Sequence, residues 1–282
     1  MRCSHSLILG MGLALWLAGP AGAALSGTSG QAGAGAAHAS TASSQRIDPV
    51  FAVDSIQSDN SFGAVGTASY AASLASASLH TEVGATADPA SSYFNSAGAQ
   101  VEALAFYDRL AFVLPAGHYA EPVVVRLRGF SLGSLYSLGC TSPQGNNCAN
   151  GYHTLNLHAG SAQGQADFSL RRDVDAGGLA ATDFNAHFAL DLPIQAAGTL
   201  AEATIAFVSV TGSLITKGTA IGTYGYPGGA DRTMFAGDAF AGFNAIEVPA
   251  GVGWTSASGV FLSQPVPEPA PTALLLSDWM LS

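Results

Sequence analysis

Residues 129–133 read Gly-Phe-Ser-Leu-Gly, which is the spacing of a serine nucleophile. In a Gly-x-Ser-x-Gly motif the serine lies on a sharp turn between a strand and a helix, where its hydroxyl is exposed for acyl transfer. Ser131 follows a predicted strand, as the motif requires. Asp167 or Asp183, together with His187, would supply a triad in the right chain order. A secreted serine hydrolase is therefore one function to consider.

The helix that should follow this serine is missing from the pattern. Residues 135–138 are brief, and Gly139 and Pro143 stop any continuation. The serine hydrolase fold also needs alternating strands and helices, which the chain does not show. We therefore expect no catalytic residues and no enzyme activity.

The histidines do not form a metal site in the sequence. His153 and His158 are five residues apart, so on one strand they point to opposite faces and cannot share an ion. His187 lies on a polar strand face with Asn185 and Asp191. A solvated histidine on a sheet face is the favoured interpretation, and we expect neither a metal nor a cofactor.

Residues 173–177 read Asp-Val-Asp-Ala-Gly, a fragment of the spacing used in calcium loops, where clustered carboxylates bind a hard cation. The glutamate at the twelfth loop position is absent, and Arg171 and Arg172 are adjacent. An ordinary turn is favoured.

Asp108 is the exception on an otherwise apolar strand face, and we expect it to pair with an arginine or to lie at a sheet edge.

Two tyrosines offer a possible carbohydrate contact. Tyr224 and Tyr226 lie in the Gly-rich stretch 222–227 and could present exposed aromatic faces, which sugar sites often use together with amides and acids. The simpler interpretation is that both tyrosines flank a turn at a strand end.

The composition excludes several classes of partner. The chain has 9 basic and 19 acidic residues, a net charge of −10, and 10% charged residues, against about 25% in ordinary globular domains. Binding to nucleic acid needs a basic footprint, so we expect no nucleic-acid partner. The hydrophobic content of 48% argues against charge-driven disorder.

Two cysteines remain once Cys3, which lies within the expected N-terminal signal peptide (residues 1–23), is set aside. Cys140 and Cys148 enclose a run of turn-forming residues, and in an oxidising compartment we expect them to form a disulfide. Free thiols are the alternative.

Short alternating segments dominate the chain after residue 46. In residues 103–114 the apolar side chains recur at every second position, as expected for a half-buried strand. The same pattern recurs around residues 123–128, 154–158, 184–192 and 258–262, with Gly and Pro turns between segments. For residues 64–87 we favour small-residue strand over helix. The pattern predicts an all-β fold, an antiparallel β-sandwich of jelly-roll type over residues 46–264.

The N-terminus has the three parts of a secretory signal peptide: a cationic tip, an apolar run over residues 7–18, and the small residues Ala-Gly-Ala at 21–23. We expect cleavage after Ala23. Residues 24–45 consist mainly of Ala, Gly, Ser and Thr, and their composition predicts a disordered, flexible linker.

The C-terminal tail, residues 265–282, contains the motif Val266-Pro267-Glu268-Pro269, followed by the apolar residues 270–276. This resembles the PEP-CTERM sorting signal of Gram-negative bacteria. The resemblance implies an exported surface or matrix protein, processing by an exosortase-type membrane protease, and association with exopolysaccharide. Thirteen residues follow Pro269 and none is Lys or Arg, whereas the family's signal ends in an arginine-rich cluster.

These observations favour an exported, non-enzymatic β-sandwich protein of the cell surface or exopolysaccharide matrix. The alternative is a polysaccharide-binding module of the same fold, and the hydrolase is third.

Overall fold

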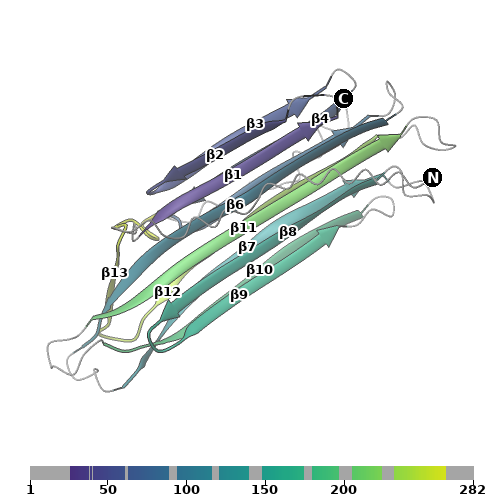
Figure 1. Cartoon of the computed structure of the whole chain (residues 1–282). Coiled ribbons are helices and arrows are strands. Elements are labelled where there is room, and N and C mark those ends of the chain that lie inside the picture. Colours follow the sequence, from purple (N-terminus) through teal and green to yellow (C-terminus); the bar gives the residue numbers. More distant parts are fainter. Residues whose placement is uncertain are drawn as a thin grey trace.

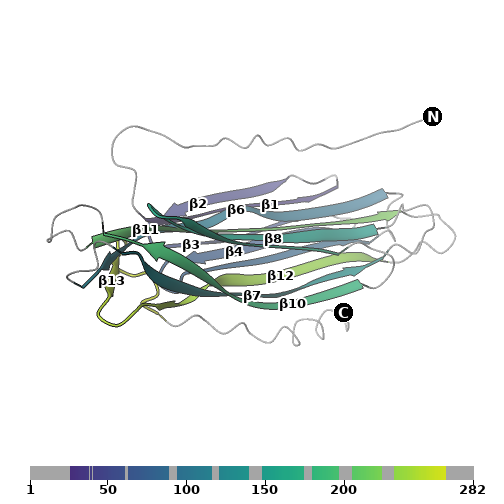
Figure 2. The same ribbon diagram turned by 90° about the horizontal axis from the view of Figure 1, so that it is seen from below.

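The computed structural model describes residues 26–37, 39, 41–60, 63–88, 94–115, 121–139, 148–174, 180–196, 205–223 and 232–264. These residues contain strands and turns and no helix. The strands form two antiparallel sheets that pack face to face, and Figure 2 shows the two layers from the side. The predicted β-sandwich is confirmed. No segment among the described residues is a helix able to cross a membrane.

One layer, which we call the β6 sheet, has the strand order β2-β1-β6-β11-β8-β9, and the short β13 also pairs with β6 (Figure 1). Its strands are β1 (Gly27–Ala36), β2 (Ala42–Asp48), β6 (Phe94–Val113), β8 (Cys148–Ser161), β9 (Gln165–Val174), β11 (Ile205–Thr223) and β13 (Gly253–Ser256). The other layer, the β7 sheet, has the order β10-β7-β12-β5-β4-β3. Its strands are β3 (Phe51–Asp59), β4 (Ala64–Ser73), β5 (Ser78–Ala87), β7 (Val123–Leu138), β10 (Ala180–Ile194) and β12 (Thr233–Glu247).

The eight strands from β5 to β12 have the connectivity of a jelly roll. The strands pair from the outside of this segment inwards: β5 with β12, β6 with β11, β7 with β10, and β8 with β9. Rolling this long hairpin onto itself adds the pairs β12–β7 and β11–β8 and closes the two sheets. The hairpin β1–β2 extends one sheet beside β6, and β3–β4 extends the other beside β5.

The prediction of a flexible linker over residues 24–45 is wrong for most of that segment. Residues 27–36 form β1, which pairs with β6, and β2 begins at Ala42. The sandwich therefore includes strands before residue 46, the boundary predicted for it. The small residues have a packing role, because a Cβ at Gly30 would lie 2.2 Å from the Tyr70 ring. Composition cannot distinguish a linker from such a strand, since the packing partner is 40 residues away.

Two other segments test the strand predictions. Residues 64–87 form β4 and β5, joined by a turn at 74–77, so the preference for strand is confirmed. The strand predicted over 258–262 is wrong, since β13 ends at Ser256 and turns follow. The backbone has positive φ at Gly259 (71°) and Leu262 (54°), which interrupts regular strand geometry.

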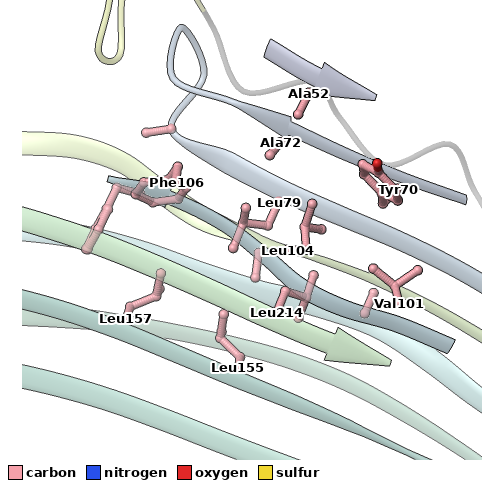
Figure 3. Packing of buried hydrophobic residues seen from close by; sticks show 14 of the residues in the cluster. Ala52, Tyr70, Ala72, Leu79, Val101, Leu104, Phe106, Leu155, Leu157 and Leu214 are labelled. Carbon is pink, nitrogen blue, oxygen red and sulfur yellow. The ribbon is translucent and has the colours of Figure 1, made fainter. Parts of the chain in front are cut away.

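The core lies between the two sheets. Leu104 on β6, Leu155 on β8 and Leu214 on β11 face Leu79 and Tyr70 of the β7 sheet (Figure 3). All five side chains are buried. Because the apolar positions alternate along each strand, the opposite face of each sheet is left to polar and exposed side chains. The outer face of the β6 sheet is one of these.

Candidate functional site

A shallow groove of about 1020 Å³ lies on the outer face of the β6 sheet. Its floor comes from β6, β11 and β8, and its rim includes the turn between β8 and β9. In Figure 1 these four strands run side by side, so the groove crosses the strands on a continuous sheet. Backbone hydrogen bonds between neighbouring strands hold this floor rigid.

One row of side chains crosses all four strands in register. Tyr107 on β6 is opposite Thr211 on β11, Thr211 is opposite His158 on β8, and His158 is opposite Asp167 on β9. Directly opposite residues project from the same face of a sheet. Each of the four is exposed or half-exposed on the outer face. An aromatic ring, a hydroxyl, an imidazole and a carboxylate are thus aligned across the groove.

The next row of the same face contains Arg109, Ser209, Gly160 and Gln165. A Cβ at Gly160 would lie 2.9 Å from His158 Nε2 and 3.3 Å from Ser209 Oγ. The Ser209 hydroxyl donates a hydrogen bond to the Gly160 carbonyl oxygen, at 3.2 Å. Because Gly160 has no side chain, there is a hollow in the middle of the row, with His158 Nε2 and Ser209 Oγ beside it.

The aromatic wall of the groove includes a cation–π pair. The Cζ atom of Arg109 lies 3.9 Å from the centroid of the Phe207 ring, and Phe207 remains exposed. Within the described part of the chain no carboxylate pairs with Arg109, whereas Arg126 is paired with Asp191. The stack holds the guanidinium in place through its face, so its N–H edge is available to another group.

The opposite side of the groove is held by local hydrogen bonds. His158 Nδ1 and Asp167 Oδ1 are 2.6 Å apart. Ser161 Oγ accepts hydrogen bonds from the backbone N of Gln163 (3.1 Å) and Gly164 (3.2 Å). The same hydroxyl donates to the Pro193 carbonyl at 2.7 Å. These bonds fix the β8–β9 turn, so the amide side chains at its exposed end are presented from a rigid base.

This set of groups can bind a ligand through both apolar and polar contacts. Exposed rings offer apolar faces, and amide, hydroxyl and carboxylate groups offer directed hydrogen bonds, as in small-molecule sites that depend on a few placed polar groups. No group of three metal-ligating side chains occurs among the described residues.

Ser131 does not form a nucleophile elbow. The residue is in the middle of β7, where it pairs with Ala186 on β10 and Ala241 on β12. Its side chain is buried, and its Oγ has no hydrogen-bond partner among the described residues. His187 lies on the exposed face of β10. The motif is therefore part of a core strand, and its glycines leave room for the rings of Phe184 and Phe188.

The two histidines of β8 point to opposite faces, as predicted. His158 lines the groove, whereas His153 is buried in the core and stacks on Phe184 with ring centroids 4.9 Å apart. Burial, with a smaller contribution from the charge of Arg172, lowers the pKa of His153 to about 4. His153 is therefore a neutral core residue at physiological pH.

The predicted acidic sites have structural partners. Asp173 is at the end of β9 and is hydrogen-bonded by Arg171, with Nη2 and Oδ1 2.7 Å apart, which lowers the pKa of Asp173. Asp175 lies outside the described residues. Asp108 is neither at a sheet edge nor paired with an arginine. It is buried and accepts hydrogen bonds from Ser258.

Several predicted features lie outside the described residues. These are Tyr224 and Tyr226, Cys140, the sorting motif at 266–269, and the signal peptide at 1–23. Cys148 begins β8, where its backbone pairs with Ile221. The Cys140–Cys148 disulfide stays a prediction.

Comparisons with protein-family models, with curated proteins and with solved structures find no match to this chain. The groove must therefore be interpreted from its own chemistry.

The groove is not apparent from the amino-acid sequence. In the sequence, Tyr107 and Arg109 only alternate with apolar residues along 103–114, and Phe207 lies in the segment 203–210, which is apolar at both odd and even positions. The available signal was an aromatic and an arginine on an outward face. Locating the groove required the pairing of β6 with β11, over about 100 residues of sequence.

Proposed function

We propose that this chain is an exported, non-enzymatic jelly-roll protein of the cell surface or exopolysaccharide matrix, and that it binds polysaccharide through the groove on the β6 sheet. The observation that carries the proposal is the pair of exposed rings, Tyr107 and Phe207, beside in-register polar groups on one rigid face. The signal-peptide pattern and the Val-Pro-Glu-Pro tail support export and a surface role.

Sugar rings have apolar C–H faces and polar hydroxyl edges, so a site for them needs both kinds of contact. Phe207 and Tyr107 can cover a sugar face at little conformational cost, because strand pairing already fixes their backbones. Thr211, Ser209 and Asp167 can exchange hydrogen bonds with hydroxyl groups. The groove lies on the outer face of a sheet and crosses several strands, which suits a segment inside a long polymer.

The test uses the full chain without its predicted signal peptide, residues 24–282, and a panel of neutral and acidic polysaccharides in affinity electrophoresis. Phe207→Ala is expected to weaken binding by about tenfold or more, because a stacked ring is lost. Phe51→Ala on β3 is the matched control. Phe51 is 46% exposed and Phe207 is 45% exposed, but Phe51 is outside the groove.

Binding that Phe207→Ala and Phe51→Ala weaken equally would remove the groove from the proposal. Failure to bind any member of the panel would overturn polysaccharide binding itself. Fractionation tests the remaining part, since a protein retained in the cytoplasm cannot act in the matrix.

A further inference from the structure

We infer that the groove selects polysaccharides whose sugars carry a carboxylate, and that Arg109 is the specificity-determining residue. This inference rests on the proposed function and adds the ligand class. It depends on three observations: the Arg109 guanidinium is held in place, it is unpaired among the described residues, and it lies at the end of the groove away from Asp167.

Arg109 is positioned by contacts that leave its hydrogen-bonding edge unused. Its backbone N donates to Asp108 Oδ1 at 2.7 Å, which fixes the start of the side chain. Its guanidinium stacks on the Phe207 ring at 3.9 Å. The first contact involves the backbone and the second involves the face of the guanidinium. Neither uses the guanidinium N–H groups, which can form a bidentate hydrogen bond with a carboxylate.

Three other arginines on the strands are each bonded to an acid. Arg126 donates two hydrogen bonds to Asp191, at 2.6 and 2.8 Å, and Arg171 is bonded to Asp173. Arg128 is bonded to Glu247. Arg46 and Arg172 likewise have no carboxylate in an ion pair among the described residues, but neither of them lines the groove. Arg109 lines the groove, where its guanidinium lies on the exposed ring of Phe207.

The acidic residues of the groove make its two ends chemically different. Asp167 lies on β9, three strands from β6, which corresponds to roughly 14 Å at the usual strand spacing. Its carboxylate is engaged by His158 at 2.6 Å and would repel a second carboxylate. Asp108 is buried beneath the sheet and bonded to Ser258. A ligand carboxylate is therefore favoured at the Arg109 end, and hydroxyl groups are favoured at the Asp167 end.

The experiment compares two polymers with the same backbone. Isothermal titration calorimetry measures the affinity of residues 24–282 for polygalacturonate and for its fully methyl-esterified form, in which the carboxylates are uncharged. Wild type is expected to bind the acid form roughly tenfold more tightly, the effect of one charge-assisted contact. Arg109→Gln should remove this preference, and Arg109→Lys should restore only part of it, because lysine keeps the charge but lacks the planar fork.

Arg126→Gln is the matched control, because Arg126 lies on the outer face of the other sheet, and the preference should survive it. Equal affinity of wild type for the two polymers, or a preference that survives Arg109→Gln, would overturn this inference. In either case binding of the ester form would leave polysaccharide binding intact. If wild type binds neither polymer nor any neutral polysaccharide, both the inference and the proposed function fail.

Discussion

The carboxylate of Asp108 on β6 accepts two hydrogen bonds from Ser258, which is 150 residues later in the chain. Oδ2 accepts from the Ser258 hydroxyl, and Oδ1 accepts from the Ser258 backbone N at 3.2 Å. Oδ1 also accepts from Arg109 N. Asp108 is only 3% exposed, so these donors supply hydrogen bonds to a carboxylate that water hardly reaches. Asp108, the acidic residue on an otherwise apolar strand face, thus holds the turn around Ser258 against β6.

Asp108→Ala is expected to lower the free energy of unfolding by about 2–4 kcal/mol, because a buried set of charge-assisted hydrogen bonds is lost. Ser258→Ala removes one donor and keeps the backbone bond, so we expect a smaller loss of about 1–2 kcal/mol. Urea unfolding gives both values. Hydrogen exchange at residues 256–264 should accelerate in Asp108→Ala, and unchanged exchange there would contradict the fastening role.

Glycine at position 218 makes room for a ring. A Cβ there would lie 1.7 Å from Cδ1 of Phe235, and one at Gly151 would lie 2.2 Å from the same ring. Gly218→Ala should therefore destabilise the protein by about 2–4 kcal/mol through overpacking. Gly253→Ala is the control, because nothing lies within 4 Å of its Cβ.

A double variant identifies the cause of that loss. Phe235→Leu removes the ring edge, so Gly218→Ala should cost less in the Leu background than in wild type. Thermal unfolding of the four proteins in the cycle measures the coupling. Additive losses would mean that the clash with Phe235 is not responsible.

Stability should fall with acid because of His153. The pKa of His153 is about 4 in the folded protein and 6.5 for an ordinary histidine. Between these values the unfolded chain binds a proton that the folded chain does not, so stability falls as the pH drops from about 6.5 to about 4 and levels off below that. The contribution of this one group is on the order of 3 kcal/mol.

His153→Phe should keep the stacking on Phe184 and remove this part of the pH dependence. The readout is the difference in unfolding free energy between variant and wild type at pH 7 and at pH 4.5. His187→Gln changes an exposed histidine and should retain the slope of the wild type. A slope in His153→Phe equal to that of wild type would show that other groups cause the acid sensitivity.

Ser131→Ala separates a core serine from a nucleophile. Because its buried hydroxyl has no partner among the described residues, its removal should leave the unfolding free energy unchanged or raise it by up to about 1 kcal/mol. Ser161→Ala, which removes the side-chain hydrogen bonds of the β8–β9 turn, should instead cost about 1–2 kcal/mol. A loss in Ser131→Ala as large as that in Ser161→Ala would contradict the assignment of Ser131.

Strand prediction succeeded where large apolar side chains alternate. Leu104, Phe106, Leu110 and Phe112 were placed on one face by period alone, and all four are buried. It failed where the strand is built from Gly and Ala, because β1 obtains its packing from Tyr70 and its pairing from β6. The strand prediction also failed after Ser256. The residues there alternate as in a strand, but Ser258 is hydrogen-bonded to Asp108 and the segment forms turns instead.

By itself the sequence determined the fold class, because a period of two requires that one face of each strand is buried. It also determined that His153 and His158 lie on opposite faces, since that follows from the spacing alone. Tertiary structure decided which residues meet, Arg109 with Phe207 and Asp108 with Ser258. It also decided that Tyr107 and Asp167 lie at the two ends of one row across the sheet. These contacts depend on strand order and register, which arise from packing between segments distant in the chain, and local pattern contains no information about them.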